Sequence, residues 1–462
     1  MLSFGVQEVA EWCGGRWMGS PREPLSGVCT DTRSLLKGNL FVALRGPNHD
    51  AHDYIAEAFS RGAHGAVVTS DRAESLAALG PILVVDDTLA ALRAMARGYR
   101  CILNAEMIAV TGSSGKTTVK EMIADVCASL GPTARTRGNW NNDIGLPLSL
   151  LSAERDARFG VFEVGMNHPG ELAPLCEILK PKWGVVTNVG PVHLEFFDSV
   201  ESIAKEKAAV PASLSRDGVA VLDRDGPYYE ILRGAAPCRV ITVSLGLDAD
   251  MSAEIHNPGE GLFTVRESAT GDSMPFRLPV PGRHMIADAM FAIAIGRSLG
   301  VAWDVLARVL GSFKPLPLRW TRVMVNGVEV VNDAYNANPM SMIAALEAFS
   351  RAEALGRKWL VLGGMRELGS ATEAEHARLG RLVAQGNWSG IVTVGPLGGI
   401  IARSVRDSAH GGMKVVECAD HRDATIELKR LVVPGDAVLL KASRAEALEK
   451  VLEGWSGERA GH

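Results

Sequence analysis

The sequence predicts an α/β protein with largely parallel sheets, divided into three domains. Apolar runs of strand length alternate with amphipathic helical segments along almost the whole chain. A chain of 462 residues is also too long for a single hydrophobic core. Pro315 and Pro317 interrupt the pattern as a linker would. We therefore predict domains over residues 1–100, 101–314 and 315–462.

Each predicted domain has its own strands and helices. In the first, we expect strands and helices over residues 40–44, 51–61, 65–69, 82–85 and 88–100. In the second, the main segments are residues 107–110, 116–130, 159–164, 184–189, 202–210 and 285–299. The third should open with a hairpin, since Asn326-Gly327 separates two apolar runs and both residue types accept positive φ. Strands at 359–362, 391–394 and 437–440 should follow.

Composition narrows the class of protein. A formal charge of −5 gives no concentrated basic face for nucleic acid, and no apolar stretch is long enough to span a membrane. Residues 1–12 lack the basic and apolar pattern of a signal peptide, so we expect a cytoplasmic protein. The seven cysteines show no C-x-x-C spacing, which favours buried free thiols over a zinc site or disulfides. We expect a monomer.

The strongest local signal is a phosphate-binding loop. The run TGSSGKTT (residues 111–118) follows an apolar strand and precedes an amphipathic helix, as in a P-loop. Lys116 is expected to reach the β- and γ-phosphates of ATP, and the Thr117 hydroxyl to bind Mg2+. Val110 stands where the longer form of the motif has glycine, so the loop is the shorter variant. The candidate ATP-binding residues here are Gly112, Ser113, Ser114, Gly115, Lys116, Thr117 and Thr118.

Two further candidates follow predicted parallel strands. Glu163 ends one strand and His193 follows another, and the carboxyl ends of such strands face the ligand crevice. Beside a P-loop, they are candidates to hold a cation against the charge of phosphoryl transfer. The helix that carries Lys205 and Lys207 reads, from its residues alone, as an ordinary helix whose lysines face solvent.

Short motifs along the whole chain resemble the Mur ligase family. In the first domain they are TDTR (30–33), GNLFVALRG (38–46) and HD (52–53). In the second they are TGSSGKTTVKE (111–121), GNWNNDIGLP (138–147), EVGMN (163–167) and HLEFF (193–197). In the third they are DAYNANPMSM (333–342) and KASR (441–444). The YNANP run resembles the members that join D-alanyl-D-alanine to UDP-N-acetylmuramoyl-tripeptide, and the DNPR run of the diaminopimelate-adding members is absent.

The resemblance implies a UDP-binding first domain, a P-loop ATPase in the middle and a Rossmann-like third domain. It implies ATP, two Mg2+ ions, an acyl-phosphate intermediate and closure of the third domain. Lys207 would be carbamylated and would bind Mg2+ with His193 and Glu163. The other implied roles are ATP binding by Asp333, Asn336 and Arg319, and substrate binding by Thr30, Asp31, Arg33, Asn139 and Asn142.

The chain departs from the family pattern at several positions. Leu318 and Gly364 stand where Gly and Asp are usual, Ala442 replaces a glycine, and Asn332 replaces an aspartate. Met285 and Asp288 occupy positions often held by asparagine, which leaves the adenine contacts open. The third residue of the tripeptide, diaminopimelate or lysine, also stays open.

Three other functions fit part of the pattern. A sister ligase could add a single amino acid or a glutamate chain, which YNANP disfavours. A P-loop kinase or NTPase would form ADP without any amine, and it would leave the first domain unexplained. A regulatory nucleotide-binding protein with an inert site fits poorly with intact Lys116, Thr117, Glu163 and His193.

Overall fold

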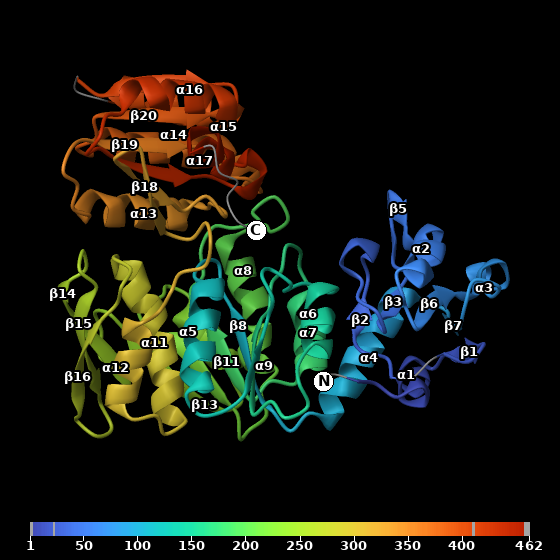
Figure 1. Cartoon of the computed structure of the whole chain (residues 1–462). Coiled ribbons are helices and arrows are strands. Elements are labelled where there is room, and N and C mark those ends of the chain that lie inside the picture. Colours follow the sequence, from blue (N-terminus) through green and yellow to red (C-terminus); the bar gives the residue numbers. More distant parts are fainter. Residues whose placement is uncertain (1–2, 22–23, 409–411, 457–462) are drawn as a thin grey trace.

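A computed structural model describes residues 3–21, 24–408 and 412–456, and contains three main β-sheets with helices packed against them (Figure 1). The sheets follow one another along the chain, so the α/β fold in three parts is confirmed. In Figure 1, the last sheet (orange to red) lies above the middle one, and the first (blue) lies to the side.

The first sheet, in the described part of the N-terminal region, is parallel except at one edge. Its strands in spatial order are β1 (Arg16–Met18), β7 (Ile82–Val85), β6 (Gly65–Thr69), β3 (Leu40–Val42) and β2 (Val28–Cys29), with β1 antiparallel. A separate pair joins β4 (Arg45–Gly46) and β5 (His49–Asp50). The helices are α1 (Val6–Cys13), η1 (Thr32–Ser34), η2 (Ala51–Tyr54), α2 (Ile55–Ser60), α3 (Ser70–Leu76) and α4 (Thr88–Ile102).

Helix α4 connects the first and middle parts of the molecule. It begins at Asp87, whose carboxylate accepts hydrogen bonds from the N–H groups of Leu89 and Ala90, and it crosses the predicted domain boundary at residue 100. Near its end, the buried Tyr99 hydroxyl donates to the carbonyl of Ala153 in the middle region at 2.6 Å. The two parts therefore share buried side chains at this helix.

The middle sheet is the largest. Its strands in spatial order are β16 (Ser273–Arg277), β15 (Leu262–Glu267), β14 (Met251–Asn257), β13 (Arg239–Ser244), β12 (Val219–Asp223), β11 (Trp183–Val186), β8 (Glu106–Thr111), β10 (Phe159–Glu163) and β9 (Thr133–Arg135). Strands β8 to β14 lie parallel, and β15 and β16 add an antiparallel edge. The helices are α5 (Lys116–Ala128), α6 (Gly145–Leu151), α7 (Leu172–Leu179), α8 (Val200–Lys207), α9 (Ala209–Ala212), α10 (Tyr229–Ala235), α11 (Arg283–Ser298) and α12 (Trp303–Gly311).

Alternation along β8 builds two cores on the two faces of this sheet. Ile108 and Val110 belong to the core that also contains buried residues of α5, α11 and α12. Met107 and Ala109 belong to the opposite core with α4, α6 and α7. The strand is apolar on both sides, as expected for a buried parallel strand.

The third sheet is parallel except for its first strand. In spatial order it contains β17 (Thr321–Val325), β18 (Val328–Asn332), β22 (Ala437–Lys441), β19 (Lys358–Leu362), β20 (Gly390–Val394) and β21 (Lys414–Cys418). The helices are α13 (Pro339–Arg351), η3 (Gly369–Ala371), α14 (Thr372–Ala384), α15 (Gly395–Ser408), α16 (His421–Leu431), η4 (Arg444–Glu446) and α17 (Glu449–Ser456). Asn326 and Gly327 have φ values of 50° and 79°, so the predicted hairpin turn between β17 and β18 is confirmed.

The register of the middle sheet places the predicted site residues at one edge. Glu163 at the end of β10 pairs with Val110, the residue before the phosphate loop, and Val186 at the end of β11 pairs with Thr111. The loop after β8 therefore lies between the carboxyl ends of its two neighbours, where ligands bind in parallel sheets.

Two smaller expectations can also be compared with the structure. All seven cysteines are free, and four are buried as predicted, but Cys13 and Cys238 are only partly buried and Cys101 is exposed. Within the described residues, none of the helices is long and apolar enough to cross a membrane.

Candidate functional site

Most of the predicted site residues line one cavity of about 1040 Å³ between the middle and C-terminal parts. Those that line it are Ser113, Ser114, Gly115, Lys116, Thr117, Thr118, Asn139, Asn142, Glu163, His193, Arg319, Asp333 and Asn336. Gly112 and Lys207 are not lining residues, and Thr30, Asp31 and Arg33 lie in the first part of the chain, away from this cavity.

The phosphate loop has the backbone that its glycines predict. Gly112 and Gly115 have φ values of 152° and 77°. A Cβ on Gly112 would lie 1.9 Å from the Thr187 hydroxyl oxygen, and one on Gly115 would lie 2.4 Å from a carboxyl oxygen of Asp288. Neither position can take a side chain without movement of its neighbours. Helix α5 begins directly after the loop, so its N-terminal N–H groups face the cavity.

Lys116 lies folded back along this loop. Its ammonium donates a hydrogen bond to the carbonyl of Gly112 at 2.9 Å. Desolvation lowers the pKa of Lys116, and the nearby charge of Glu163 acts in the opposite direction. The Lys116 amine is therefore placed at the loop, where a bound phosphate would favour its charged form and add a partner to the Gly112 carbonyl.

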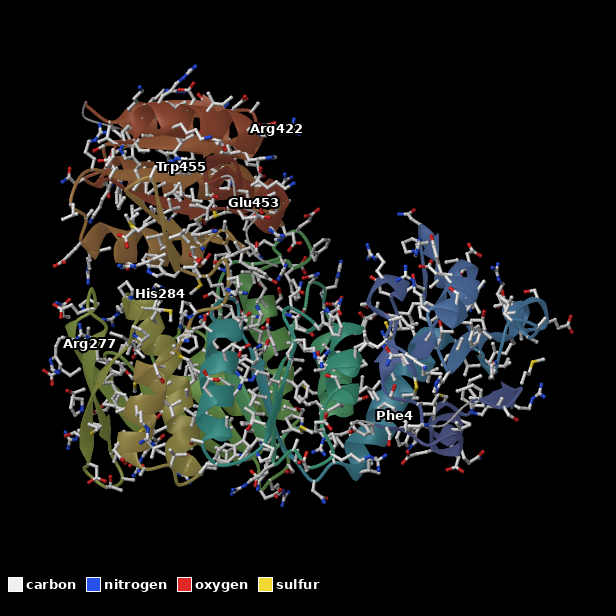
Figure 2. The ribbon with its side chains drawn as sticks, viewed as in Figure 1. Phe4, Arg277, His284, Arg422, Glu453 and Trp455 are labelled. Atoms are coloured by element: carbon white, nitrogen blue, oxygen red, sulfur yellow. The ribbon has the colours of Figure 1, made fainter. Side chains whose placement is uncertain are left out.

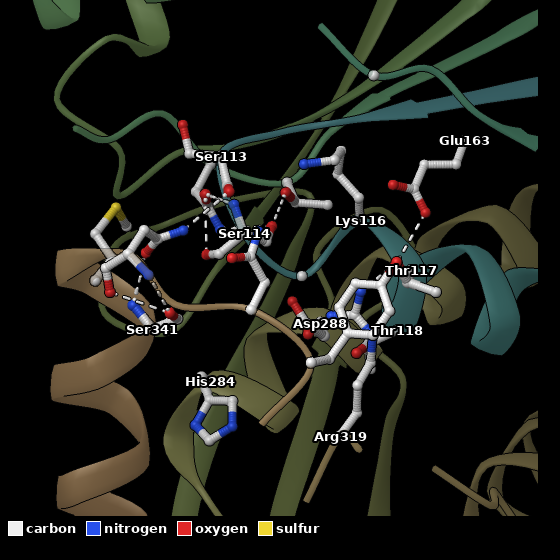
Figure 3. A pocket seen from close by; sticks show the side chains of 18 of the residues that line it. Ser113, Ser114, Lys116, Thr117, Thr118, Glu163, His284, Asp288, Arg319 and Ser341 are labelled. Carbon is white, nitrogen blue, oxygen red and sulfur yellow. Dashed lines mark hydrogen bonds between the residues drawn. The ribbon is translucent and has the colours of Figure 1, made fainter. Parts of the chain in front are cut away.

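Glu163 is a buried carboxylate with a defined set of partners. Only 2% of its surface is exposed, and it accepts hydrogen bonds from the Thr117 hydroxyl at 2.8 Å and the Asn141 amide at 2.7 Å. Its own backbone N–H donates to the Thr136 hydroxyl at 2.8 Å. Figure 3 shows Thr117 and Glu163 joined at the start of α5. The arrangement holds two hard oxygen ligands side by side beside the phosphate loop.

Arg319, in the segment between the middle and C-terminal parts, contacts Thr117 at the start of α5. Its guanidinium donates to the Thr117 hydroxyl at 2.9 Å and lies over the ring of Tyr335, 4.2 Å from the centroid. The preceding residue, Leu318, has a φ of 62°, a conformation that favours glycine. A glycine, the residue that the resemblance implies at this position, would adopt this conformation freely, whereas Leu318 adopts it at some cost in backbone strain.

Lys207 is buried, so the interpretation from its residues alone, a lysine facing solvent, is wrong. Its exposed fraction is 2%, and burial lowers its pKa well below the usual value, assisted by the charge of Lys116. Among the described residues, no side chain or carbonyl forms a hydrogen bond or ion pair with its ammonium. The neighbouring Lys205 does face solvent and pairs with Glu201 at 2.7 Å. The buried face of α8 contains Ile203, Ala204 and Lys207, a helical spacing that could have identified the buried lysine.

His193 meets a residue that the sequence did not indicate. Its Nδ1 is hydrogen-bonded to a carboxylate oxygen of Glu367, in the loop between β19 and η3 of the C-terminal part. This bond is the main reason that the pKa of Glu367 lies below its usual value. Both residues have positive φ, 54° and 63°. The contact joins a cavity-lining residue of the middle part to a residue of the C-terminal part.

The C-terminal part contributes a second group of polar contacts. The Lys441 ammonium donates to the Asp333 carboxylate at 2.6 Å and to the Asn336 carbonyl at 3.2 Å. Helix α13 begins at Asn338, whose side chain caps the N–H of Ser341 and also donates to the Ser113 carbonyl at 3.2 Å. The motif around residues 333–342 therefore touches the phosphate loop directly.

Two titratable residues of α11 line the cavity, and one of them, Asp288, lies against Gly115 of the phosphate loop. His284 lies at the end of the middle part that faces the C-terminal part (Figure 2), and burial lowers its pKa to about 4. Asp288, one turn further, is 7% exposed, and burial raises its pKa well above the usual value. Burial therefore disfavours the charged form of both side chains, and His284 is neutral at neutral pH.

The predicted residues of the first domain form a separate cluster. Asp31 caps η1 by accepting a hydrogen bond from the Arg33 N–H at 2.9 Å, and it pairs with the Arg33 guanidinium at 2.6 Å. The Arg33 side chain is 86% exposed. These two residues and Thr30 are thus brought together with one another but not with the phosphate loop.

The donor atoms fit Mg2+ only in part. The hydroxyl of Thr117 and the carboxylate of Glu163 are hard oxygen ligands of the kind that Mg2+ prefers. Across the described ranges, no three His, Cys, Asp or Glu side chains gather into a metal-binding group. Phosphate oxygens and water would therefore have to complete the coordination, as is usual for Mg2+ beside a nucleotide.

Four residues of this arrangement were not singled out from the sequence, although three of them lie inside motifs quoted above. They are Asn141, Asn338, Lys441 and Glu367. Asn141 stands between two chosen asparagines of GNWNND, and Asn338 and Lys441 belong to YNANP and KASR. Glu367 is two residues before Gly369, and no pattern of spacing marks it.

Comparison with known proteins follows the same division of the chain. Residues 110–296 match the model of the Mur ligase middle domain, and residues 318–444 match that of the Mur ligase, glutamate ligase domain. The chain is 33% identical over 458 residues to the UDP-N-acetylmuramoyl-tripeptide–D-alanyl-D-alanine ligase of Bacillus subtilis (strain 168), covering 98% of both chains. The enzyme of that name from Escherichia coli (strain K12) gives the same identity and coverage.

Solved structures agree with these relatives. A crystal structure of MurF from Acinetobacter baumannii has a TM-score of 0.88 and 28% identity, with 99% of each chain covered. The MurF ligase from Thermotoga maritima, solved in complex with ADP, has a TM-score of 0.79 and 29% identity, covering 94% of this chain and 97% of that one. On the full-length identity, the two family matches and the shared fold, the chain belongs to the Mur ligase family.

Proposed function

We propose that this protein is an ATP-dependent ligase that adds D-alanyl-D-alanine to UDP-N-acetylmuramoyl-tripeptide, forming the pentapeptide precursor of peptidoglycan. The observation that carries the proposal is the cavity in which the phosphate loop, the buried Glu163 and the motif at residues 333–342 meet. The activity named for the Bacillus subtilis and Escherichia coli relatives supports the choice of substrates.

The first step activates a carboxylate. The γ-phosphoryl group of ATP passes to a carboxylate oxygen of the tripeptide, which gives an acyl phosphate and ADP. This step replaces an oxide leaving group by phosphate. Lys116 and the N-terminal N–H groups of α5 hold the phosphates and neutralise charge as it moves between them. The ADP found with the Thermotoga maritima relative supports a nucleotide in this cavity.

The second step forms the amide. The amine of D-alanyl-D-alanine attacks the acyl carbon, the tetrahedral intermediate collapses, and phosphate leaves as the nitrogen loses a proton. Asn139 and Asn142 line the cavity on the side of the middle domain and are placed to hold the acyl end of the tripeptide. Asp333 and Asn336 line it from the C-terminal side, where the ATP ribose would lie.

Two Mg2+ ions are part of the proposal. Thr117 and Glu163 would hold one of them, and His193, with a carbamate on Lys207, the other. A bound Mg2+ ion supplies positive charge against the transferring phosphoryl oxygens. The buried, unpartnered amine of Lys207 supports the carbamate, because only a neutral amine reacts with CO2 and the lowered pKa favours that form.

The first domain would hold the uridine nucleotide. Thr30, Asp31 and Arg33 form an exposed polar cluster there, and the Arg33 guanidinium could pair with a diphosphate. The tripeptide would then extend from this domain into the cavity. Because ATP and the nucleotide precursor are the substrates, we place the reaction in the cytoplasm, carried out by a monomer.

Phosphate release tests the proposal. Purified protein is given ATP, Mg2+ and UDP-N-acetylmuramoyl-tripeptide, with and without D-alanyl-D-alanine, and the product is identified by mass. We expect sustained phosphate release only when both the tripeptide and the dipeptide are present. Equal release without any amine would indicate a kinase or NTPase, and release with a single amino acid in place of the dipeptide would indicate a sister ligase.

A further inference from the structure

The contact between His193 and Glu367 joins two domains at the edge of the cavity. His193 belongs to the loop after β11 in the middle domain, and Glu367 belongs to the loop after β19 in the C-terminal domain. The two side chains are 20% and 41% exposed. They are 174 residues apart in the chain, so the bond exists only when the C-terminal domain is seated on the middle domain as it is here.

The backbones of the two loops also meet. The Glu195 N–H donates to the Glu367 carbonyl at 3.2 Å. A Cβ on Gly369 would lie 3.0 Å from the Glu195 Cα and 3.1 Å from the Leu194 carbonyl, so the close approach suits a glycine there. The loops are therefore in direct contact, and the side-chain pair is part of a continuous interface.

Both residues of the pair have left-handed backbone conformations. His193 has a φ of 54° and Glu367 a φ of 63°, a conformation that is unfavourable for residues other than glycine. Each loop therefore adopts an unfavourable backbone conformation at the residue whose side chain makes the contact. Backbone strain of this kind tends to gather at functional sites.

The main effect of this hydrogen bond is on the imidazole of His193, and specifically on which ring nitrogen is free to bind a cation. In a neutral imidazole, a hydrogen bond from Nδ1–H to Glu367 leaves the lone pair on Nε2. In the part of the chain that the structure describes, no donor is bonded to Nε2. His193 lines the same cavity as Lys116 and Glu163. The carboxylate thus holds the ring in the form that can bind a cation.

We infer that Glu367 is a positioning residue for the ligation reaction, which binds Nδ1 of His193 across the domain boundary and presents Nε2 to a divalent cation once the C-terminal domain has closed. This inference rests on the proposed function. It assigns to the C-terminal domain a part in building the cation site on the middle domain. A histidine that binds a metal ion often donates its other ring N–H to a carboxylate in this way. Loss of that carboxylate typically lowers the affinity for the metal ion 10- to 100-fold.

A second contact between the same domains makes it possible to distinguish a residue that positions His193 from one that only holds the domains together. Asn338 of α13 donates to the Ser113 carbonyl at 3.2 Å and does not involve His193. Loss of Asn338 should weaken closure but leave the Glu367 carboxylate free to bind His193 in the closed form. Loss of Glu367 should change the imidazole as well. The two variants therefore differ in the one property that the inference concerns.

The test measures the binding of Mn2+ by electron paramagnetic resonance in the presence of ADP, for the wild type and for Glu367→Ala, Glu367→Gln and Asn338→Ala. Glu373→Gln is the matched control, because Glu373 is an exposed glutamate of the same domain. We expect Glu367→Ala to bind Mn2+ 10- to 100-fold more weakly, and Glu367→Gln, whose amide oxygen can still accept from Nδ1, to recover most of that loss. In steady-state kinetics, kcat should fall while KM for ATP changes little.

A double variant makes the inference specific. In a His193→Ala background, Glu367→Ala should cause no further loss of Mn2+ affinity, since the ring that it holds is gone. Circular dichroism and small-angle scattering establish that each variant folds and compacts with ligands. Mn2+ affinity at the wild-type level in folded Glu367→Ala would overturn the inference and leave Glu367 with a docking role alone. The Mn2+ comparison needs no ligation, so it is separable from a failure of the wild type to form the pentapeptide.

Discussion

The hydroxyl of Thr117 and the carboxylate of Glu163 lie 2.8 Å apart, although 46 residues separate them along the chain. They come from the first turn of α5 and from the end of β10, which lies beside β8 in the sheet. Glu163 is also held by Asn141, so its two oxygens are both oriented. The pair places a hydroxyl and a negative charge at the point where a nucleotide-bound cation would lie.

Replacement of Glu163 by Gln should therefore remove activity without unfolding the protein. The amide keeps the size of the side chain and one acceptor oxygen, but it has no negative charge for a cation. We expect the rate of dipeptide-dependent phosphate release to fall by about 10²–10³-fold, the usual effect of losing one preorganised charge. Glu177→Gln, on the exposed face of α7, is the control and should retain the wild-type rate. A rate for Glu163→Gln within threefold of the wild type would contradict this role.

Replacement of Lys116 by Ala should nearly abolish ligation. The ammonium bonds to the Gly112 carbonyl and has no buried acidic partner of its own in the loop, so the fold should stay intact. We expect turnover to fall by at least about 10²–10³-fold, with the thermal unfolding profile unchanged. The measurement is phosphate release at saturating substrates. Near-normal turnover in a folded Lys116→Ala protein would remove the phosphate loop from the mechanism.

Replacement of Lys207 tests whether its buried amine acts in the reaction as a carbamate. Lys207→Met should be inactive, and in buffer free of CO2 it should melt at a higher temperature than the wild type, because a buried amine without partners is lost. Bicarbonate should raise the melting temperature of the wild type but not of the variant. Lys207→Ala should regain part of its activity in acetate or formate.

The exposed neighbour supplies the control for that experiment. Lys205→Met changes a lysine on the same helix that faces solvent, and it should leave both activity and the bicarbonate response unchanged. If Lys207→Met were fully active in the absence of any additive, the carbamate would have no part in the reaction.

The raised pKa of Asp223 predicts that the stability of the protein depends on pH. Burial raises its pKa to about 6 from 3.8, so the free energy of unfolding that it contributes is present below about pH 4 and is lost as the pH rises through 6. Asp223→Asn keeps an acceptor for the Asp225 N–H, which lies 3.0 Å away, and cannot ionise. It should be more stable than the wild type at pH 8, by up to about 3 kcal/mol.

The predicted effect of Asp223→Asn on stability is measured by thermal unfolding, without nucleotide, at pH 8 and pH 4. The melting temperature of Asp223→Asn should exceed that of the wild type at pH 8, and the difference should disappear at pH 4. Asp156→Asn, an exposed carboxylate, is the control and should show little difference at either pH. A variant less stable than the wild type at pH 8 would show that the ionised carboxylate has a favourable partner.

Local patterns in the sequence predicted the main strands and helices well. The phosphate loop, its strand and its helix were recognised because glycine spacing and apolar periodicity are properties of a short segment. The turn at Asn326-Gly327 is of the same kind, since both residues must accept positive φ and both do. The antiparallel edge formed by β14, β15 and β16 was not predicted, although Pro258-Gly259 and Gly271-Asp272 mark its two turns, because exposed polar residues interrupt the apolar pattern of its strands.

The candidate site was predicted as a set of residues but not as a set of contacts. Glu163 and His193 were chosen because parallel strands end at the same edge, and the structure places both beside the phosphate loop in one cavity. Spacing could not show that Asn141 holds Glu163 or that Asn338 reaches Ser113. Those bonds depend on which loops meet, and loops from different domains meet only after the chain has packed.

The sequence by itself determined the α/β alternation, the phosphate loop and the polar residues at the strand ends, because each of these follows from neighbouring residues. The tertiary structure alone decided that Lys207 is buried without a partner while Lys205 is solvated, and that Glu367 faces His193. Burial and long-range contact depend on the packing of segments far apart in the chain. A buried amine and a carboxylate across a domain boundary acquire their chemistry only from that packing.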